Sequence, residues 1–291
     1  MKGLHFVIGA LTTMALTFTG VSGVAAQDSV DSRCTNPDEI SCVDWEAGIA
    51  IAAGTGAPMS NPPNRAVANQ SAVRAAKQDA FRNLLELIEG INVTSSTTMR
   101  DAMIESDTVK SQVEGSLRGV RQIGRTRYFD DGSVQVTMEA RLREIIPDSL
   151  IIGEGSGPPR EITPPESVPR SGTRLQAGTV YTGLVIDARG TGVTPAMSPK
   201  VLDPGGREVY GSAYVSREFV ISQGMAGYVK TMDAATSNER VQGNPAIIKA
   251  MSASGPNQAD VVISQEDADT LRAISQTQTF LRESRVMIVL D

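Results

Sequence analysis

Apolar side chains recur at helical spacing between residues 65 and 89. Intervals of three or four residues place such side chains on one face of a helix. Gly90 follows the run, where a left-handed C-terminal cap often ends a helix. We therefore predict a helix over residues 65–89 whose buried stripe consists of Val73, Ala76, Ala80, Leu84, Leu87 and Ile88.

Shorter runs with the composition of strands lie on both sides of this helix. Residues 45–53 (WEAGIAIAA) are small or β-branched and lead into the breaker sequence 54–58, and residues 91–99 (INVTSSTTM) are rich in Thr and Ser. Both segments predict strands. Residues 104–116 predict a second helix, with Ile104, Val109 and Val113 facing inward.

A β-hairpin is expected next. Residues 119–129 and 133–143 flank Asp130-Asp131-Gly132, which has the composition of a tight hairpin turn. The second strand alternates strictly between apolar and polar positions. Its core-facing side chains are Val134, Val136, Met138, Ala140 and Leu142, and its outward side chains are Gln135, Thr137, Glu139, Arg141 and Arg143.

Residues 153–172 (GEGSGPPREITPPESVPRSG) divide the chain. Five prolines and four glycines prevent a continuous helix or central strand, so this segment is a semi-extended linker. The expected boundaries are a signal peptide (1–26), an N-terminal segment (27–43), a first domain (44–150), the linker (151–175) and a second domain (176–291).

The second domain begins with a run that is apolar on both faces, residues 179–188, which predicts a central strand. Residues 198–202 and 208–210 should pair around the turn Asp203-Pro204-Gly205-Gly206. Residues 217–230 favour a helix, although Gly224 and Gly227 weaken that pattern, and residues 245–252 favour a short helix.

The end of the chain has a clearer pattern. Residues 260–263 and 285–290 are strand-like, and Ser264 with Asp267 forms an N-cap signature for a helix that runs to about Glu283. The stripe of this helix consists of Ala268, Leu271, Ile274, Gln278 and Leu281. Strand, helix and strand predict a right-handed βαβ unit with parallel strands.

The fold class expected from these patterns is α+β, with two small α/β domains. The first has the order β-α-β-α-β-β, and the second has a mixed sheet that ends in the βαβ unit.

The N-terminus has the three parts of a cleavable signal peptide: basic Lys2, an apolar run to Val24, and small residues before Gln27. The alternative is a retained membrane anchor, but the densest apolar stretch is shorter than the roughly 20 residues of a membrane span. We expect cleavage after Ala26 and a periplasmic protein with no integral span. A lipid anchor would need a Cys directly after the apolar run, whereas Cys34 follows a polar stretch.

Cys34 and Cys42 are the two cysteines of the chain. In an oxidising compartment a close pair predicts a disulfide, which would stabilise the fold by about 2–3 kcal/mol. A metal or redox pair is the alternative, but such pairs usually have CxxC spacing or further ligands nearby.

Composition excludes several kinds of chemistry. The only histidine, His5, lies in the signal peptide. The mature chain therefore lacks Ser-His-Asp and Cys-His nucleophile systems and the usual zinc ligands. The formal net charge of -6 also makes nucleic acid a poor partner. We expect no catalytic residue, no cofactor and no metal site.

A small-ligand or partner contact is conceivable at Asp187, Arg189 and Tyr210, which lie at predicted strand ends. The glycine-rich loop 187–192 could cradle a phosphate or be a plain loop, and the prolines that follow it favour the plain loop. Asp130 and Asp131 could in principle form a hydrolase pair, but adjacent acids in a hairpin are typical turn formers.

The first domain resembles the Lpp-twenty lipoprotein domain family, which is itself similar to the N-terminal part of flagellar ring-assembly proteins. The resemblance rests on the segments 53–56, 75–76, 80–86, 90–93, 96–99 and 114–119, and on the Asp-Asp-Gly hairpin. It implies an envelope location and a structural or assembly role without enzyme activity. This chain differs from the family because it lacks the lipid-acceptor cysteine.

These observations favour a periplasmic envelope protein that acts through protein–protein contacts. Its expected partners are envelope or outer-membrane proteins, with flagellar ring components among them. The alternative is a periplasmic protein that binds a small ligand or glycan.

Overall fold

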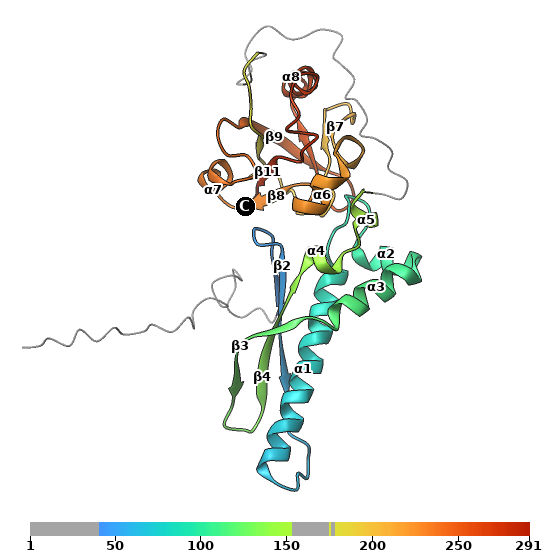
Figure 1. Cartoon of the computed structure of the whole chain (residues 1–291), viewed down its shortest axis with the longest axis vertical. Coiled ribbons are helices and arrows are strands. Elements are labelled where there is room, and N and C mark those ends of the chain that lie inside the picture. The colour runs from blue at the N-terminus through green and yellow to red at the C-terminus, as the bar shows by residue number, and fades with distance from the viewer. Residues whose placement is uncertain (1–40, 153–174, 176–177) are drawn as a thin grey trace, which may run out of the picture.

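The computed structural model describes residues 41–152, 175 and 178–291 (Figure 1). The expected signal peptide, Cys34 and the linker segment 153–172 lie outside the described residues. The elements of residues 41–152 form one sheet with its helices, and those of residues 178–291 form a second. The fold is α+β, as predicted from the sequence.

The first sheet has the strand order β1-β2-β4-β3, and all of its pairs are antiparallel. Its strands are β1 (Ser41–Asp44), β2 (Ile49–Gly56), β3 (Arg121–Tyr128) and β4 (Val134–Arg141). The helices of this part are α1 (Arg65–Glu89), α2 (Met99–Glu105), α3 (Asp107–Leu117), α4 (Leu142–Ile145) and α5 (Asp148–Ile152).

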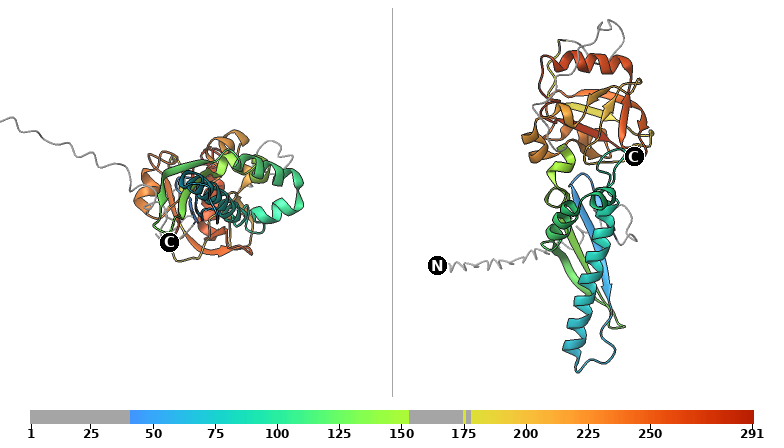
Figure 2. Two further views of the ribbon diagram at one scale, coloured as in Figure 1. Left: turned by 90° about the horizontal axis from the view of Figure 1, so that it is seen from below. Right: turned by 90° about the vertical axis from the view of Figure 1, so that its right-hand side faces the viewer.

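Helix α1 has the predicted bounds and covers one face of this sheet (Figures 1 and 2). Its buried side chains are Ala72, Ala76, Ala80, Leu84 and Ile88. They face β2, where a Cβ added to Gly54 would lie 1.9 Å from the Ala80 backbone nitrogen. Gly54 is therefore a site of close helix–sheet packing inside the strand, and the sequence-based interpretation of residues 54–58 as a breaker was wrong for Gly54 and Gly56.

Several sequence-based boundaries in this part need correction. Gly90 has φ −76°, so it continues the right-handed turn instead of forming a left-handed cap. Residues 91–98 form an irregular segment instead of a strand, and Met99 begins α2. The predicted helix 104–116 is two helices, because Ser106 ends α2 and caps α3. Val109 and Val113 are buried as predicted, but Ile104 is 77% exposed.

The hairpin of β3 and β4 is confirmed, and Gly132 at its turn has φ +83°. Val134, Val136, Ala140 and Leu142 are buried as predicted, whereas Met138 is only partly buried. Leu142 lies in α4, just after the strand. Glu139 was expected to face solvent but is only 6% exposed, because it pairs with Arg121 across the two strands (2.7 Å). The observed order is β-β-α-α-α-β-β-α-α, so the predicted β-α-β-α-β-β order was wrong in detail.

The second sheet has seven strands in the order β7-β6-β10-β9-β5-β11-β8. They are β5 (Leu184–Asp187), β6 (Val201–Leu202), β7 (Glu208–Tyr210), β8 (Gly227–Val229), β9 (Ala246–Ser254), β10 (Asp260–Ile263) and β11 (Val286–Val289). The helical elements are η1 (Ser212–Tyr214), α6 (Arg217–Gln223), α7 (Met232–Ser237) and α8 (Gln265–Ser275). Strand β5 is central and β6 pairs with β7, as predicted.

The predicted parallel βαβ unit at the chain end was wrong. Strands β9, β5 and β11 are parallel to one another, whereas β10 is antiparallel to β9. The chain therefore enters α8 from a strand that runs opposite to β11, and two strands lie between them in the sheet. The N-cap of Ser264 is confirmed, since its Oγ accepts a hydrogen bond from the Asp267 backbone N–H (3.0 Å).

Three further predictions in this part were wrong. Residues 246–254 form strand β9 where a short helix was expected, and α8 ends at Ser275, before Glu283. Helix α6 ends at Gln223 because Gly224 takes φ +78°, after which the chain enters β8. Within the described residues, no helix is both long enough and apolar enough to cross a membrane.

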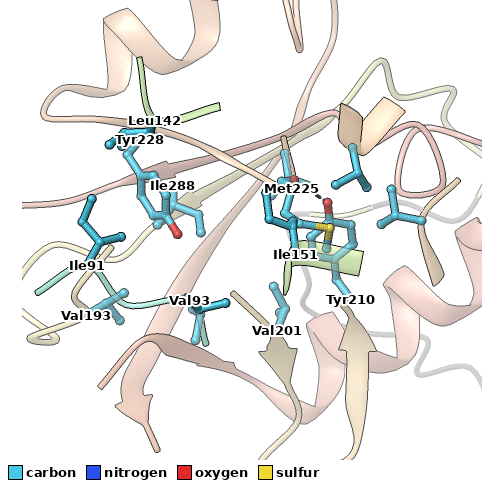
Figure 3. Close-up of a cluster of buried hydrophobic side chains, with 14 of the residues drawn as sticks. Ile91, Val93, Leu142, Ile151, Val193, Val201, Tyr210, Met225, Tyr228 and Ile288 are labelled. Atoms are coloured by element: carbon cyan, nitrogen blue, oxygen red, sulfur yellow. Dashed lines mark hydrogen bonds between the residues drawn. The ribbon is translucent and has the colours of Figure 1, made fainter. Parts of the chain in front are cut away.

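The two sheets share one hydrophobic core (Figure 3). Ile91, Val93, Leu142 and Ile151 come from the first part, and they belong to the same buried cluster as Val193, Val201, Tyr210, Met225, Tyr228 and Ile288 of the second. The described part of the molecule is elongated along one axis, with the loop before α1 at one end, the β3–β4 turn close to that end, and α8 near the other end (Figures 1 and 2).

Candidate functional site

The carboxyl ends of parallel strands are the usual ligand sites of open α/β sheets. Here Asp187 ends β5, and Asp291 follows β11 at the same edge. The Arg189 guanidinium donates two hydrogen bonds to the Asp187 carboxylate, one from Nε (2.8 Å) and one from Nη2 (2.8 Å). The hydrogen bond from Arg189 is the main cause that holds the pKa of Asp187 below its ordinary value.

The glycine-rich loop after β5 is hydrogen-bonded to a carboxylate of the chain itself, that of Asp291. The Gly190 N–H donates to both carboxylate oxygens of Asp291 (3.0 Å each). Gly190 and Gly192 have φ +75° and +74°, a backbone conformation that favours glycine. The backbone donor that an anion would use here already has a carboxylate partner, which favours the plain-loop interpretation of residues 187–192.

Tyr210 does not join Asp187 and Arg189. It lies on β7, and three strands separate β7 from β5 in the sheet order. Its ring is buried in the shared core, and its hydroxyl donates to the Met225 carbonyl. The three residues suggested from the sequence therefore do not form one contact site, because Tyr210 is a core residue.

Asp130 and Asp131 lie in the β3–β4 turn, as expected. The Asp131 carboxylate accepts hydrogen bonds from the Ser133 hydroxyl (2.6 Å) and the Ser133 backbone N–H (2.8 Å). These bonds lower the pKa of Asp131, with the hydroxyl as the larger cause. The geometry is that of a turn stabilised by an aspartate.

Cys42 is buried on β1 and packs with Ile49, Ile51 and Ile123 on the sheet face opposite α1. Cys34 lies outside the described residues, so the Cys34–Cys42 disulfide stays a prediction. Among the described residues, no group of three or more acidic, Cys or His side chains is arranged to hold a metal ion.

A hollow of about 390 Å³ lies beside the start of β3. Its charged lining consists of two ion pairs, Arg121–Glu139 (2.7 Å) and Arg141–Glu144 (3.3 Å). Ligand pockets are mostly apolar with a few polar groups. Because its charges pair with one another, this hollow resembles a surface depression more than a ligand pocket.

The segment Ile91–Met99 builds the junction between the two parts of the molecule. Asn92 forms a parallel bridge with Ala196, and its carbonyl accepts a hydrogen bond from the Met197 N–H (2.9 Å). The Val93 carbonyl accepts from the Ser198 N–H (2.8 Å). This irregular segment of the first part therefore continues the backbone hydrogen bonding of the second.

Side chains reinforce this junction. The Ser95 hydroxyl donates to Asp260 on β10 (2.5 Å), and the Ser95 carbonyl accepts from the Asn257 N–H (2.8 Å). The Arg143 guanidinium donates to the carbonyls of Ile221 and Ser222 at the end of α6.

Aromatic and buried polar contacts complete the junction. Trp45 packs edge-on against Tyr228, with ring centroids 5.6 Å apart. The Ser198 hydroxyl donates to the Ile151 carbonyl (3.0 Å). Sequence reasoning missed the junction because Asn92 and Ser95 have no local signal for a partner more than 100 residues away.

The far end of the first part exposes apolar side chains. Tyr128 and Phe129 at the end of β3 are 62% and 45% exposed, and Met59 in the loop before α1 is also exposed. The two loops are adjacent, since a Cβ added to Gly132 would lie 3.6 Å from Pro58 Cγ. We call Pro58, Met59, Tyr128 and Phe129 the distal tip.

Comparison with known proteins matches a family model to the C-terminal part of this chain. No curated protein matches this chain. The first domain lies outside the matched range, so its resemblance to the Lpp-twenty family stays a prediction. Residues 183–291, from just before β5 to the last residue, are similar to the second domain of Treponema pallidum Tp0624.

Proposed function

We propose that this chain is an exported, non-enzymatic envelope protein with a structural or assembly role through protein–protein contacts. One observation carries the proposal, namely the junction that joins both sheets into a single elongated body (Figure 2). An assembly protein must hold distant contact surfaces at a fixed separation. A shared core and continuous backbone hydrogen bonds suit that task, because interfaces between independent domains are usually smaller and more polar.

The sequence supports the location. The signal-peptide pattern of residues 1–26 favours export to the periplasm, and the lack of a cysteine after it favours retention by partners over a lipid anchor. The Lpp-twenty resemblance of the first domain adds an envelope role. The proposed partners are envelope or outer-membrane proteins, with flagellar ring components among them.

The test is affinity capture of the tagged, exported chain after cross-linking in intact cells, with a motility assay of the deletion strain beside it. We expect the same envelope protein to be recovered in repeated captures, in a ratio that does not change with expression level. A chain that elutes alone, and carries a bound small molecule in native mass spectrometry, would instead support the ligand-binding alternative.

A further inference from the structure

The face of the first sheet opposite α1 carries a buried row of side chains. The strand register places Cys42 of β1, Ile51 of β2 and Glu139 of β4 beside one another. Their exposed fractions are 9%, 3% and 6%. Ile49 and Ile123 pack with Cys42 and Ile51 and extend the apolar part of this surface. We call these five residues the Cys42 face.

The described helices pack elsewhere. The buried side chains of α1 to α5 belong to the two clusters that contain Ala50, Ala52, Val134 and Val136, on the other side of the sheet. The apolar members of the Cys42 face all come from β1, β2 and β3. A sheet face without a second layer is normally solvated, and its side chains keep much of their surface in water. The burial of Ile51 therefore requires a further layer.

The sequence offers a candidate layer directly before β1. Residues 27–40 (QDSVDSRCTNPDEI) precede Ser41 and lie outside the described residues. They contain Cys34, the expected disulfide partner of Cys42. The Cα atoms of two bonded cysteines are about 4.4–6.8 Å apart. Because the Cys42 side chain lies on the Cys42 face, this disulfide would hold Cys34 over the same face.

The segment is long enough to cross the sheet. Residues 27–33 precede Cys34, and an extended chain of that length reaches about 23–25 Å. Four strands at the usual spacing span roughly 15 Å. The polar residues of this stretch suit an outer layer that faces water, and Val30 supplies an apolar side chain.

We propose that residues 27–40 form a strap that covers the Cys42 face and is held there by a disulfide between Cys34 and Cys42. The inference goes beyond the proposed assembly function and does not depend on it. The strap keeps an apolar sheet face away from water and from other proteins. Since Cys34 and Cys42 are the two cysteines of the chain, reduction of this one bond releases the strap.

The first test places a photo-crosslinking amino acid at Thr137 in the full, oxidised mature chain. Thr137 pairs with Ala53 and Ile123, so it lies on the same side of the sheet as the Cys42 face. We expect an intramolecular cross-link to residues 27–40, mapped by peptide mass spectrometry, and its loss after reduction. The matched control carries the same amino acid at Arg74, an exposed position of α1 on the other side of the sheet, and should give no such cross-link.

The second test needs no probe in the sheet. Dithiothreitol passes two electrons and two protons to the disulfide, which gives the Cys34 and Cys42 thiols and leaves the reagent as its cyclic disulfide. We expect this reduction to raise the fluorescence of the apolar dye ANS about threefold, because Ile49, Ile51 and Ile123 become accessible. The far-ultraviolet circular dichroism should not change. The double variant Cys34→Ser/Cys42→Ser should show the high fluorescence at once and should not respond to dithiothreitol.

Several results would overturn the proposal. A cross-link from Thr137 to residues 153–177 would assign the cover to the linker, and a cross-link to a second copy would assign it to a dimer. Equal cross-linking from Thr137 and Arg74, or unchanged dye fluorescence after complete release of both thiols, would remove the strap. The assembly function would stand in each case, because it rests on the junction between the two sheets.

Discussion

At the scale of single residues, two glycines of β2 set the distance between helix and sheet. An added Cβ on Gly56 would lie 2.3 Å from the Ala72 carbonyl oxygen, and one on Gly54 would meet Ala80. The contact atoms belong to the backbone of α1, so a side chain cannot simply move them aside. The alanines of α1 and the glycines of β2 therefore form one close contact between helix and sheet, which depends on the small size of both.

The packing at Gly54 can be tested by a substitution that adds a single methyl group to this residue. Gly54→Ala should lower the free energy of unfolding by about 1–3 kcal/mol or more, because the added carbon overpacks the helix–sheet contact. Gly115→Ala is the control. Gly115 lies in α3 with open space around its Cα, so alanine should stabilise the chain by about 0.5–1 kcal/mol. Urea unfolding measures both changes, and equal effects would contradict the packing account.

At the scale of elements, a buried carboxylate links the β6–β7 hairpin to α8. Asp203 accepts hydrogen bonds from the backbone N–H groups of Gly205 and Arg207 (2.9 Å each). It also pairs with Arg272 (2.8 Å), whose side chain is only 7% exposed. The second arginine that pairs with Asp203 is Arg207, whose side chain is 68% exposed.

Asp203→Ala should therefore cost about 3–5 kcal/mol, because it leaves the buried Arg272 without its closest carboxylate. Arg207→Ala removes an exposed partner of the same carboxylate and should cost about 0–1 kcal/mol. Chemical denaturation of the two variants gives the comparison. A small effect of Asp203→Ala would show that the hairpin does not depend on this link.

The capping box of α2 predicts a pH dependence. The pKa of Asp101 is held below its ordinary value, first by the hydrogen bond from the Thr98 backbone N–H and then by the Thr98 hydroxyl. A carboxyl whose pKa is lowered in the folded state stabilises it above the unfolded pKa of about 3.9, and this contribution is lost as pH falls through the folded value. Asp101→Asn should flatten the decline in stability below about pH 4 in urea titrations, whereas an unchanged decline would exclude the box as a contributor.

Elements with a strong local pattern were predictable from the sequence. Helix α1, the β3–β4 hairpin and the fully buried β11 each carry their own signal in spacing or turn composition. Strand β9 could also have been found, since Ala246, Ile248 and Ala250 are buried and alternate with exposed Lys249 and Met251. The bounds of α2 and α3 depended on the single cap Ser106, which a helical period does not reveal.

At the scale of the whole molecule, the junction determines how the two parts of the chain pack together and whether they unfold together. The structure of residues 91–99 depends on partners near Ala196 and Asn257, so no local pattern could have predicted it. The same holds for the candidate contact site, because the place of Tyr210 in the shared core follows from the strand order. Long-range contacts thus determined the parts that sequence reasoning missed.

The two parts should unfold together. Trp45 is the only tryptophan and reports on its contact with Tyr228 across the junction. We expect its fluorescence and the far-ultraviolet circular dichroism to change in one coincident thermal transition. Two separated transitions in the wild type would mean that the two parts are independent domains.

Gly255→Ala should separate these transitions. Gly255 has φ +83°, and an added Cβ would lie 2.4 Å from the Ser95 Cβ across the junction. The strained backbone and the clash should loosen the contact with residues 91–99 while each sheet keeps its own ladder. Gly178 also has a positive φ, but an added Cβ there would meet open space. Gly178→Ala therefore serves as the control for backbone strain alone.

We propose that this chain works by holding protein partners on one elongated body. The most direct test places a photo-crosslinking amino acid at Phe129 in the distal tip, in cells that export the full chain. We predict a cross-link to one defined envelope protein. Absence of any protein cross-link from Phe129, together with normal export and folding, would contradict the account.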